Sequence, residues 1–118
     1  MISVQKEDFD VGQEIADLSS ASSGIGAVAT FTGFVRDVNE GEQVSDLYLD
    51  HYPGMTVKSL EEIVRKARER WSLQAVRVIH RVGLLKIDDQ IVFVGVASKH
   101  RQAAFDACAY IMDFLKTE

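Results

Sequence analysis

One segment, residues 91–97, constrains the fold more than any other part of the chain, because its positions are all apolar or glycine (Ile-Val-Phe-Val-Gly-Val-Ala). The run is far shorter than the roughly 20 residues with which a helix crosses a bilayer. A short apolar run rich in β-branched residues is typical of a strand that is buried on both faces. We therefore expect Gln90–Ser98 to form a central strand of a sheet.

Length and composition indicate a single globular domain over residues 1–118, with 47% hydrophobic and 26% charged residues. The 13 Lys and Arg against 18 Asp and Glu give a net charge of −5, which argues against general nucleic-acid binding. The only cysteine, Cys108, excludes an internal disulfide and is expected to be a buried small hydrophobe. We expect no bound metal or cofactor, since no His, Asp and Glu spacing predicts a metal site. Residues 1–20 lack a basic start and an apolar signal core, which predicts a soluble, cytoplasmic protein without a membrane anchor.

Hydrophobic periodicity and turn residues predict the element order β-α-β-β-α-β-β-α. The expected strands and helices are a strand at 2–9, a helix capped by Asp10, a hairpin of 27–36 with 44–52, a helix capped by Thr56, strands at 75–82 and 90–98, and a helix at 99–116. The last helix is expected to bury a stripe formed by Ala104, Phe105, Cys108, Ile111, Met112 and Leu115. Hairpins outnumber crossovers in this order, so we expect an α+β fold with helices packed on a mainly antiparallel sheet.

The start of the last helix carries cations where acids are favoured. Its first turn reads Ser98-Lys99-His100-Arg101, although the partial positive charge of a helix N-terminus disfavours cations. Helical spacing places Arg101 close to the centre of the expected apolar stripe, so its side chain is expected to point inward. Two interpretations remain open: an internal partner such as Asp46 or Asp50, or a bound phosphate or carboxylate.

Two further cations stand at the ends of predicted elements. Arg36 ends a strand in which Gly33 allows the close approach of another backbone or a ligand, although a strand-end arginine is usually only solvated. Lys116 closes the last helix, where a cation is electrostatically favoured in any protein. It also lies on the flank of the apolar stripe, where a partly desolvated amine can act as a nucleophile or an acid.

Five sequence blocks, in order, resemble the family of molybdopterin synthase catalytic (large) subunits, the MoaE family. They are FTGFVR at 31–36, HYPGMT at 51–56, IHRVG at 79–83, VFVGV at 92–96 followed by His100-Arg101, and IMDFLKT at 111–117. The resemblance covers the chain from about residue 27 to its last residue. It implies an α/β hammerhead-like fold and a sulfurtransferase of molybdenum cofactor biosynthesis.

The resemblance also implies a substrate, a partner and a set of site residues. Sulfur passes from the thiocarboxylated C-terminal glycine of a small ubiquitin-like (MoaD-like) subunit to cyclic pyranopterin monophosphate, which forms the dithiolene of molybdopterin. Two large subunits form a homodimer with a small subunit at each end, which makes a heterotetramer. The substrate-binding positions of the family pocket fall on Phe34, Val35, Arg36, His100 and Arg101, and the catalytic position falls on Lys116.

The family pattern continues beyond the point at which this sequence ends. Members usually have, after the position of Lys116, an aromatic and basic segment with a second pocket lysine, whereas this sequence ends at Glu118. Three interpretations are open: the sequence omits a tail that the protein has, the chain was cut before the tail, or this member has lost part of its site. The competing hypothesis is a non-catalytic α+β module that binds an anion or a partner's tail. On the enzyme hypothesis, we expect Arg36, His100 and Arg101 to converge on one anion-binding pocket.

Overall fold

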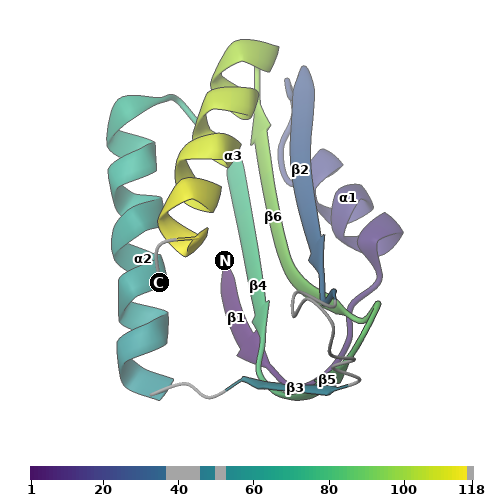
Figure 1. The fold of residues 1–118 in the computed structure, drawn as a ribbon. Helices are drawn as coiled ribbons and strands as arrows, with labels where there is room; N and C mark the ends of the chain where they lie inside the picture. The colour runs from purple at the N-terminus through teal and green to yellow at the C-terminus, as the bar shows by residue number, and fades with distance from the viewer. Residues whose placement is uncertain (37–45, 50–52, 117–118) are drawn as a thin grey trace.

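The main sheet has four strands in the order β1-β4-β6-β2 (Figure 1). The computed structural model of the protein describes residues 1–36, 46–49 and 53–116. The strands of the main sheet are β1 (Ile2–Gln5), β4 (Ala75–Arg81), β6 (Gln90–Ser98) and β2 (Ala27–Phe34). β1 pairs in parallel with β4, whereas β6 is antiparallel to both β4 and β2. The predicted α+β fold with a mainly antiparallel sheet is confirmed.

Strand β6 lies inside the sheet and is covered on both faces. Its last six residues, from Phe93 to Ser98, are all buried. Figure 1 shows α2 (Pro53–Arg70) and α3 (Arg101–Lys116) on one face of the sheet and α1 (Val11–Ser19) on the other. Successive side chains of a strand point to opposite faces, so a strand covered on both sides is apolar at every position. The central place predicted for Gln90–Ser98 is confirmed.

A buried cluster of side chains lies on each face of the sheet. The larger cluster joins α2 and α3 to the sheet and includes Leu60, Val78, Val94, Val96 and Ile111. The smaller one lies under α1 and consists of Leu18, Ile79 and Phe93, with Phe9 packed against it. Burial of each such aliphatic or aromatic side chain contributes about 1.5–3 kcal/mol. The helices are therefore held by their apolar faces, which also fixes where α3 begins relative to the sheet.

Strand pairing differs from the predicted hairpin. β2 pairs with β6, while β3 (Asp46–Leu49) pairs with β5 (Gly83–Lys86) in a separate two-stranded sheet. The hairpin prediction was wrong because the doubly buried β6 needs a neighbour on each side, and β2 fills one of these places. β5 was predicted as loop, since four residues are too few to show a period. The predicted turn at 37–43 lies outside the described residues, as does most of the predicted second strand.

The ends of several elements also differ from the predictions. α1 begins as predicted, because the Asp10 carboxylate accepts a hydrogen bond from the backbone N–H of Gln13 at 3.1 Å. α2 begins at Pro53 rather than after Thr56, and proline is favourable in a first helical turn because its missing N–H has no partner there. β1 ends at Gln5 instead of residue 9.

Candidate functional site

The predicted site residues lie at the two ends of strand β2. The β2–β6 register pairs Ala27 with Ser98, so the start of β2 lies beside the start of α3. At the other end Phe34 pairs with Gln90, and Arg36 follows two residues later. At about 3.3 Å per residue, the two ends are roughly 23 Å apart. Within one chain, the structure therefore does not bring Arg36 together with His100 and Arg101.

The start of α3 presents exposed cations beside a closely packed glycine. Lys99, His100 and Arg101 are exposed and line, with Gly26 and Gln102, a shallow pocket of about 430 Å³. The Gly26 N–H donates to the carbonyl of Ser98 at 3.0 Å. A Cβ at position 26 would collide with the carbonyl oxygen of Lys99. Gly26, which the sequence analysis did not select, thus allows β2 to hold the cation-bearing turn by direct backbone packing.

The expected inward orientation of Arg101 was wrong. The buried residues of α3 are Ala104, Ala107, Cys108 and Ile111, whereas Phe105 is 63% exposed. At about 100° per residue, replacing Phe105 by Ala107 in the stripe rotates its centre away from Arg101, which leaves Arg101 exposed.

Of the two internal partners considered for Arg101, only Asp46 falls among the described residues. Asp46 belongs to β3, at the opposite end of the molecule from the start of α3 (Figure 1). Asp50 lies outside the described residues.

The far end of β2 alternates between exposed and buried side chains. The β2–β6 register shifts between Gly33 and Phe34, after which Phe34 is 55% exposed, Val35 is buried and Arg36 is exposed. The close neighbour of Gly33 is a side chain and not the backbone that was expected: Val92 Cγ1 would lie 2.8 Å from a Cβ at position 33. Arg36 is therefore presented to solvent next to an anchored valine.

Lys116 lies at the end of a groove between α3 and β2. The groove has a volume of about 480 Å³ and is lined by Ala29, Thr30, Phe31, Phe105, Cys108, Ala109, Met112, Asp113 and Lys116. The α3 residues recur every three or four positions, so Lys116 shares one helix face with Met112. Lys116 itself is exposed. Burial raises the pKa of the Cys108 thiol to about 11, so this thiol stays protonated at neutral pH and is no nucleophile.

The three predicted cations remain available for an anion. No carboxylate in the described part of the chain forms an ion pair with Arg36, Arg101 or Lys116. In the same residue ranges, no cluster of His, Cys, Asp and Glu has the geometry of a metal site. No described helix is long and apolar enough to span a membrane.

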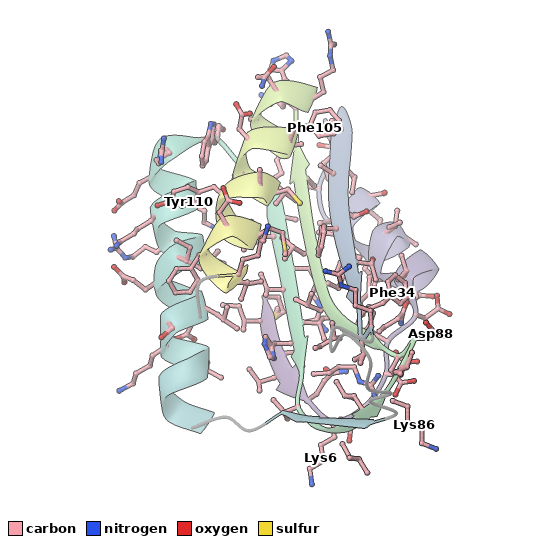
Figure 2. All side chains as sticks on the ribbon, viewed as in Figure 1. Lys6, Phe34, Lys86, Asp88, Phe105 and Tyr110 are labelled. Atoms are coloured by element: carbon pink, nitrogen blue, oxygen red, sulfur yellow. The ribbon has the colours of Figure 1, made fainter. Side chains whose placement is uncertain are left out.

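The outer edge of β2 carries exposed aromatic residues. β2 is the last strand of its sheet, and Phe31, Phe34 and Phe105 are 40%, 55% and 63% exposed. Figure 2 shows Phe105 beside the start of β2 and Phe34 at its far end. We call the edge of β2 with these three residues the β2 surface. An open strand edge with apolar side chains is a site for pairing with another chain.

Comparison with known proteins gives matches over nearly the whole chain. The MoaE family model, described as MoaE protein, matches residues 4–118. The molybdopterin synthase catalytic subunit of Vibrio cholerae is 61% identical over 116 residues, covering 98% of this chain and 77% of that protein. The catalytic subunit of Pseudomonas aeruginosa is 53% identical with the same coverage.

Solved structures match in the same way. The MoaE protein from Burkholderia ambifaria superposes with a TM-score of 0.91 at 45% identity, covering 100% of this chain and 77% of that one. Molybdopterin synthase from Staphylococcus aureus superposes with a TM-score of 0.87 at 29% identity, covering 98% and 82%.

Proposed function

The chain belongs to the MoaE family of molybdopterin synthase catalytic subunits, enzymes that transfer sulfur in molybdenum cofactor biosynthesis, and we propose that it converts cyclic pyranopterin monophosphate to molybdopterin. The sulfur donor is the thiocarboxylated C-terminus of a small ubiquitin-like subunit. The observation that carries the proposal is the family match over residues 4–118, which includes every predicted site position. Because the relatives are catalytic subunits, the enzyme is favoured over the non-catalytic binding module.

The exposed cations supply what a phosphate-bearing substrate needs. Charge-assisted hydrogen bonds from arginine to phosphate are stronger than neutral ones, and a helix N-terminus adds backbone N–H donors. Arg101 and His100 stand at such a terminus, and Arg36 is exposed without an ion-pair partner among the described residues. We assign these three residues, with the neighbouring Phe34 and Val35, to substrate binding.

One complete site requires two copies of the chain. α3 runs in the same direction as β2, so Lys116 lies toward the end of β2 that carries Arg36, away from His100 and Arg101 (Figure 1). If the β2 surface pairs with a second copy about a twofold axis, the two strands run antiparallel. The start of one β2 then lies beside the end of the other. Each of the two sites combines Arg36 and Lys116 of one copy with His100 and Arg101 of its partner.

The same pairing covers the exposed aromatic residues. Phe31 lies near the middle of β2, where a twofold axis would place it close to its copy, and Phe105 faces the same groove. Burying these rings removes apolar area from water at about 25 cal/mol per Å². The homodimer is therefore supported by the exposed aromatic residues of the β2 surface as well as by the separation of Arg36 from His100 and Arg101.

Lys116 is proposed to act on the sulfur transfer itself. Release of sulfur from a thiocarboxylate creates anionic intermediates, which a fixed ammonium stabilises or protonates. A neutral amine would instead attack the acyl carbon of the partner's tail. Lys116 is exposed, so the partial desolvation considered for its amine is not observed.

We infer a cytoplasmic location for this reaction. The inference is supported by the thiol of Cys108, which is free and buried. Chains without disulfides are typical of reducing compartments.

The activity is tested directly by mixing the protein with thiocarboxylated small subunit and cyclic pyranopterin monophosphate. Molybdopterin formation, measured as its fluorescent oxidation product, is the expected result. A protein that binds both molecules and forms no molybdopterin would instead support the binding module.

The composite site is tested by complementation between two variants that are impaired in substrate binding, assayed at a substrate concentration at which each has little activity. Arg36→Ala and Arg101→Ala are each expected to weaken substrate binding by about 1.5–3 kcal/mol. Mixed dimers of the two, purified through different affinity tags, contain one intact site of two and should recover about half of the wild-type activity.

The matched control pairs variants from the same end of β2. Mixed dimers of Arg36→Ala with Lys116→Ala have no intact site, because both residues come from the same copy, and should stay inactive. If the first pair also stays inactive while its dimers form normally, Arg36 and Arg101 do not share a site across copies.

A further inference from the structure

We propose that the turn between β5 and β6, formed by residues 86–89, is a positioning device for Arg36, with Asp89 as the residue on which it depends. The inference rests on the proposed function, because it concerns the binding of substrate by Arg36. The turn is far from the start of α3, so its effect on the site is confined to the Arg36 end of β2.

The turn holds the residue just before Arg36 on both sides of its backbone. The Val35 N–H donates to the carbonyl of Asp89 at 2.9 Å, and the Asp88 N–H donates to the carbonyl of Val35 at 2.8 Å. The Val35 side chain is buried. Val35 is thus fixed by its backbone and its side chain together, while Arg36 is exposed.

The turn is itself built to keep this shape. The Asp89 N–H donates to the carbonyl of Lys86 at 2.9 Å, and the Asp89 carboxylate accepts from the Lys86 N–H at 2.9 Å. Asp88, the third residue of the turn, has a φ of +77°, as a type II turn requires at this position. Aspartate is one of the few residues other than glycine that adopt this conformation. The Asp89 side chain therefore closes a ring of hydrogen bonds around the turn.

The register shift near the end of β2 explains why this end needs additional contacts. We call the two hydrogen bonds between Val35 and the turn the clamp. Between Gly33 and Phe34 the β2–β6 register shifts by one residue, and the last strand pair is Phe34 with Gln90, so neither Val35 nor Arg36 is held by a partner in the β2–β6 register. Figure 2 shows Phe34 and Asp88 at the same end of the molecule. Arginine binds phosphate through a rigid planar fork, and small displacements of such a group are costly to binding and rate. The clamp on Val35 supplies the missing orientation.

The test compares Asp89→Ala with Asp89→Asn in the protein of residues 1–118. Affinity for cyclic pyranopterin monophosphate is measured by calorimetry without the sulfur donor, so that turnover does not enter. We expect Asp89→Ala to weaken binding about tenfold, less than the roughly hundredfold loss of rate that a misplacement of 1 Å can cause. Asp89→Asn keeps an oxygen acceptor for the Lys86 N–H and should bind within about threefold of wild type. Hydrogen exchange at the Val35 amide should accelerate in Asp89→Ala alone.

Two controls separate positioning from a loss of stability. Ile63→Val removes a buried methyl group from α2, which packs against β1 and α3, and should lower stability without changing substrate affinity. In an Arg36→Ala background, Asp89→Ala should weaken binding by less than about twofold further, because the residue that it positions is gone.

The outcomes distinguish this inference from the proposed function. If Arg36→Ala binds the substrate as wild type does, the assignment of Arg36 fails and the inference fails with it. If Arg36→Ala weakens binding but Asp89→Ala does not, or if the two losses add in full, the inference alone is overturned. Loss of binding in Asp89→Ala, recovery in Asp89→Asn and no further loss beside Arg36→Ala would establish it.

Discussion

The two ends of strand β2 present cations by different physical means. At the start of the strand, the turn before α3 is held by close packing, since Gly26 lies against the backbone of Lys99 and leaves no room for a side chain. At the far end, Arg36 follows a shift in the strand register and is oriented by two backbone hydrogen bonds to Val35. Close-packed contacts can be compressed very little, so an added atom strains the whole region. Hydrogen bonds in an exposed turn can instead be lost one at a time by local opening. We therefore expect a substitution in the packing at the start of β2 to lower the stability of the protein. A substitution in the turn that holds Val35 is expected to weaken substrate binding.

The largest expected effect is a loss of turnover rate on replacing Lys116, which lies in the groove between α3 and β2. Lys116→Ala should lower the turnover rate at least about a hundredfold, the usual scale for a positioned acid–base group, and leave dimerisation and partner binding intact. Single-turnover formation of molybdopterin measures the rate, and sedimentation measures the assembly. The matched control is Lys66→Ala, which removes an exposed lysine from α2 and should have wild-type activity. Near-normal turnover of Lys116→Ala would make Lys116 an ordinary helix-terminal cation.

A smaller effect is expected from filling the close contact at the start of β2. Gly26→Ala should lower the free energy of unfolding by about 2–3 kcal/mol, because the added methyl group collides with the Lys99 carbonyl and the backbone has to move. Urea denaturation measures this change.

Gly12→Ala is the matched control for that substitution. Position 12 lies in α1, where a Cβ meets nothing closer than 3.4 Å and alanine is the better helix former. It should be neutral or stabilising. Equal stability of the Gly26 and Gly12 variants would show that the start of β2 is not held by packing.

The smallest expected effect is a pH dependence of the free energy of unfolding, which comes from Cys108 in the wall of the groove. Burial raises the pKa of the Cys108 thiol to about 11, above its usual value of about 8.5, so the folded state favours the neutral thiol. The resulting stability is fully present below about pH 8.5 and is lost as the pH rises toward 11, with a slope of at most about 1.4 kcal/mol per pH unit. Urea denaturation at pH 7.5 and pH 10 measures the loss.

Cys108→Ala isolates the thiol from other groups that titrate in this range. The variant should lose less stability between the two pH values than wild type does, even though its stability at pH 7.5 is lower. The same loss of stability in both proteins would show that the thiol, and with it the groove between α3 and β2, is accessible to water.

Much of the fold was predictable because it depends on local periodicity. The apolar run at 91–97 predicted a doubly covered strand, and the helical spacing of Ala104, Cys108 and Ile111 predicted side chains of α3 that are buried. The N-cap at Asp10 was visible as a residue type at a fixed distance from the helix. Each of these signals lies within a few residues of the structure that it predicts.

The site was predicted only in part. Arg36, His100, Arg101 and Lys116 stand out by their position at the ends of elements, and the resemblance to a known family gave them roles. The orientation of Arg101 failed because a single exposed aromatic residue, Phe105, was counted as buried. The turn at Asp88 and Asp89 was seen only as a loop, since its contacts are with a residue more than fifty positions earlier in the chain.

By itself, therefore, the sequence determined which segments are strands and helices and which of their faces are apolar, because these properties are set by neighbours along the chain. Only the tertiary structure decided that β2 pairs with β6, and that pairing separates Arg36 from His100 and Arg101 by the length of a strand. Strand partners are chosen by the burial of whole faces against one another, a free energy to which every element contributes. The pattern of residues within one segment therefore does not show which strands pair.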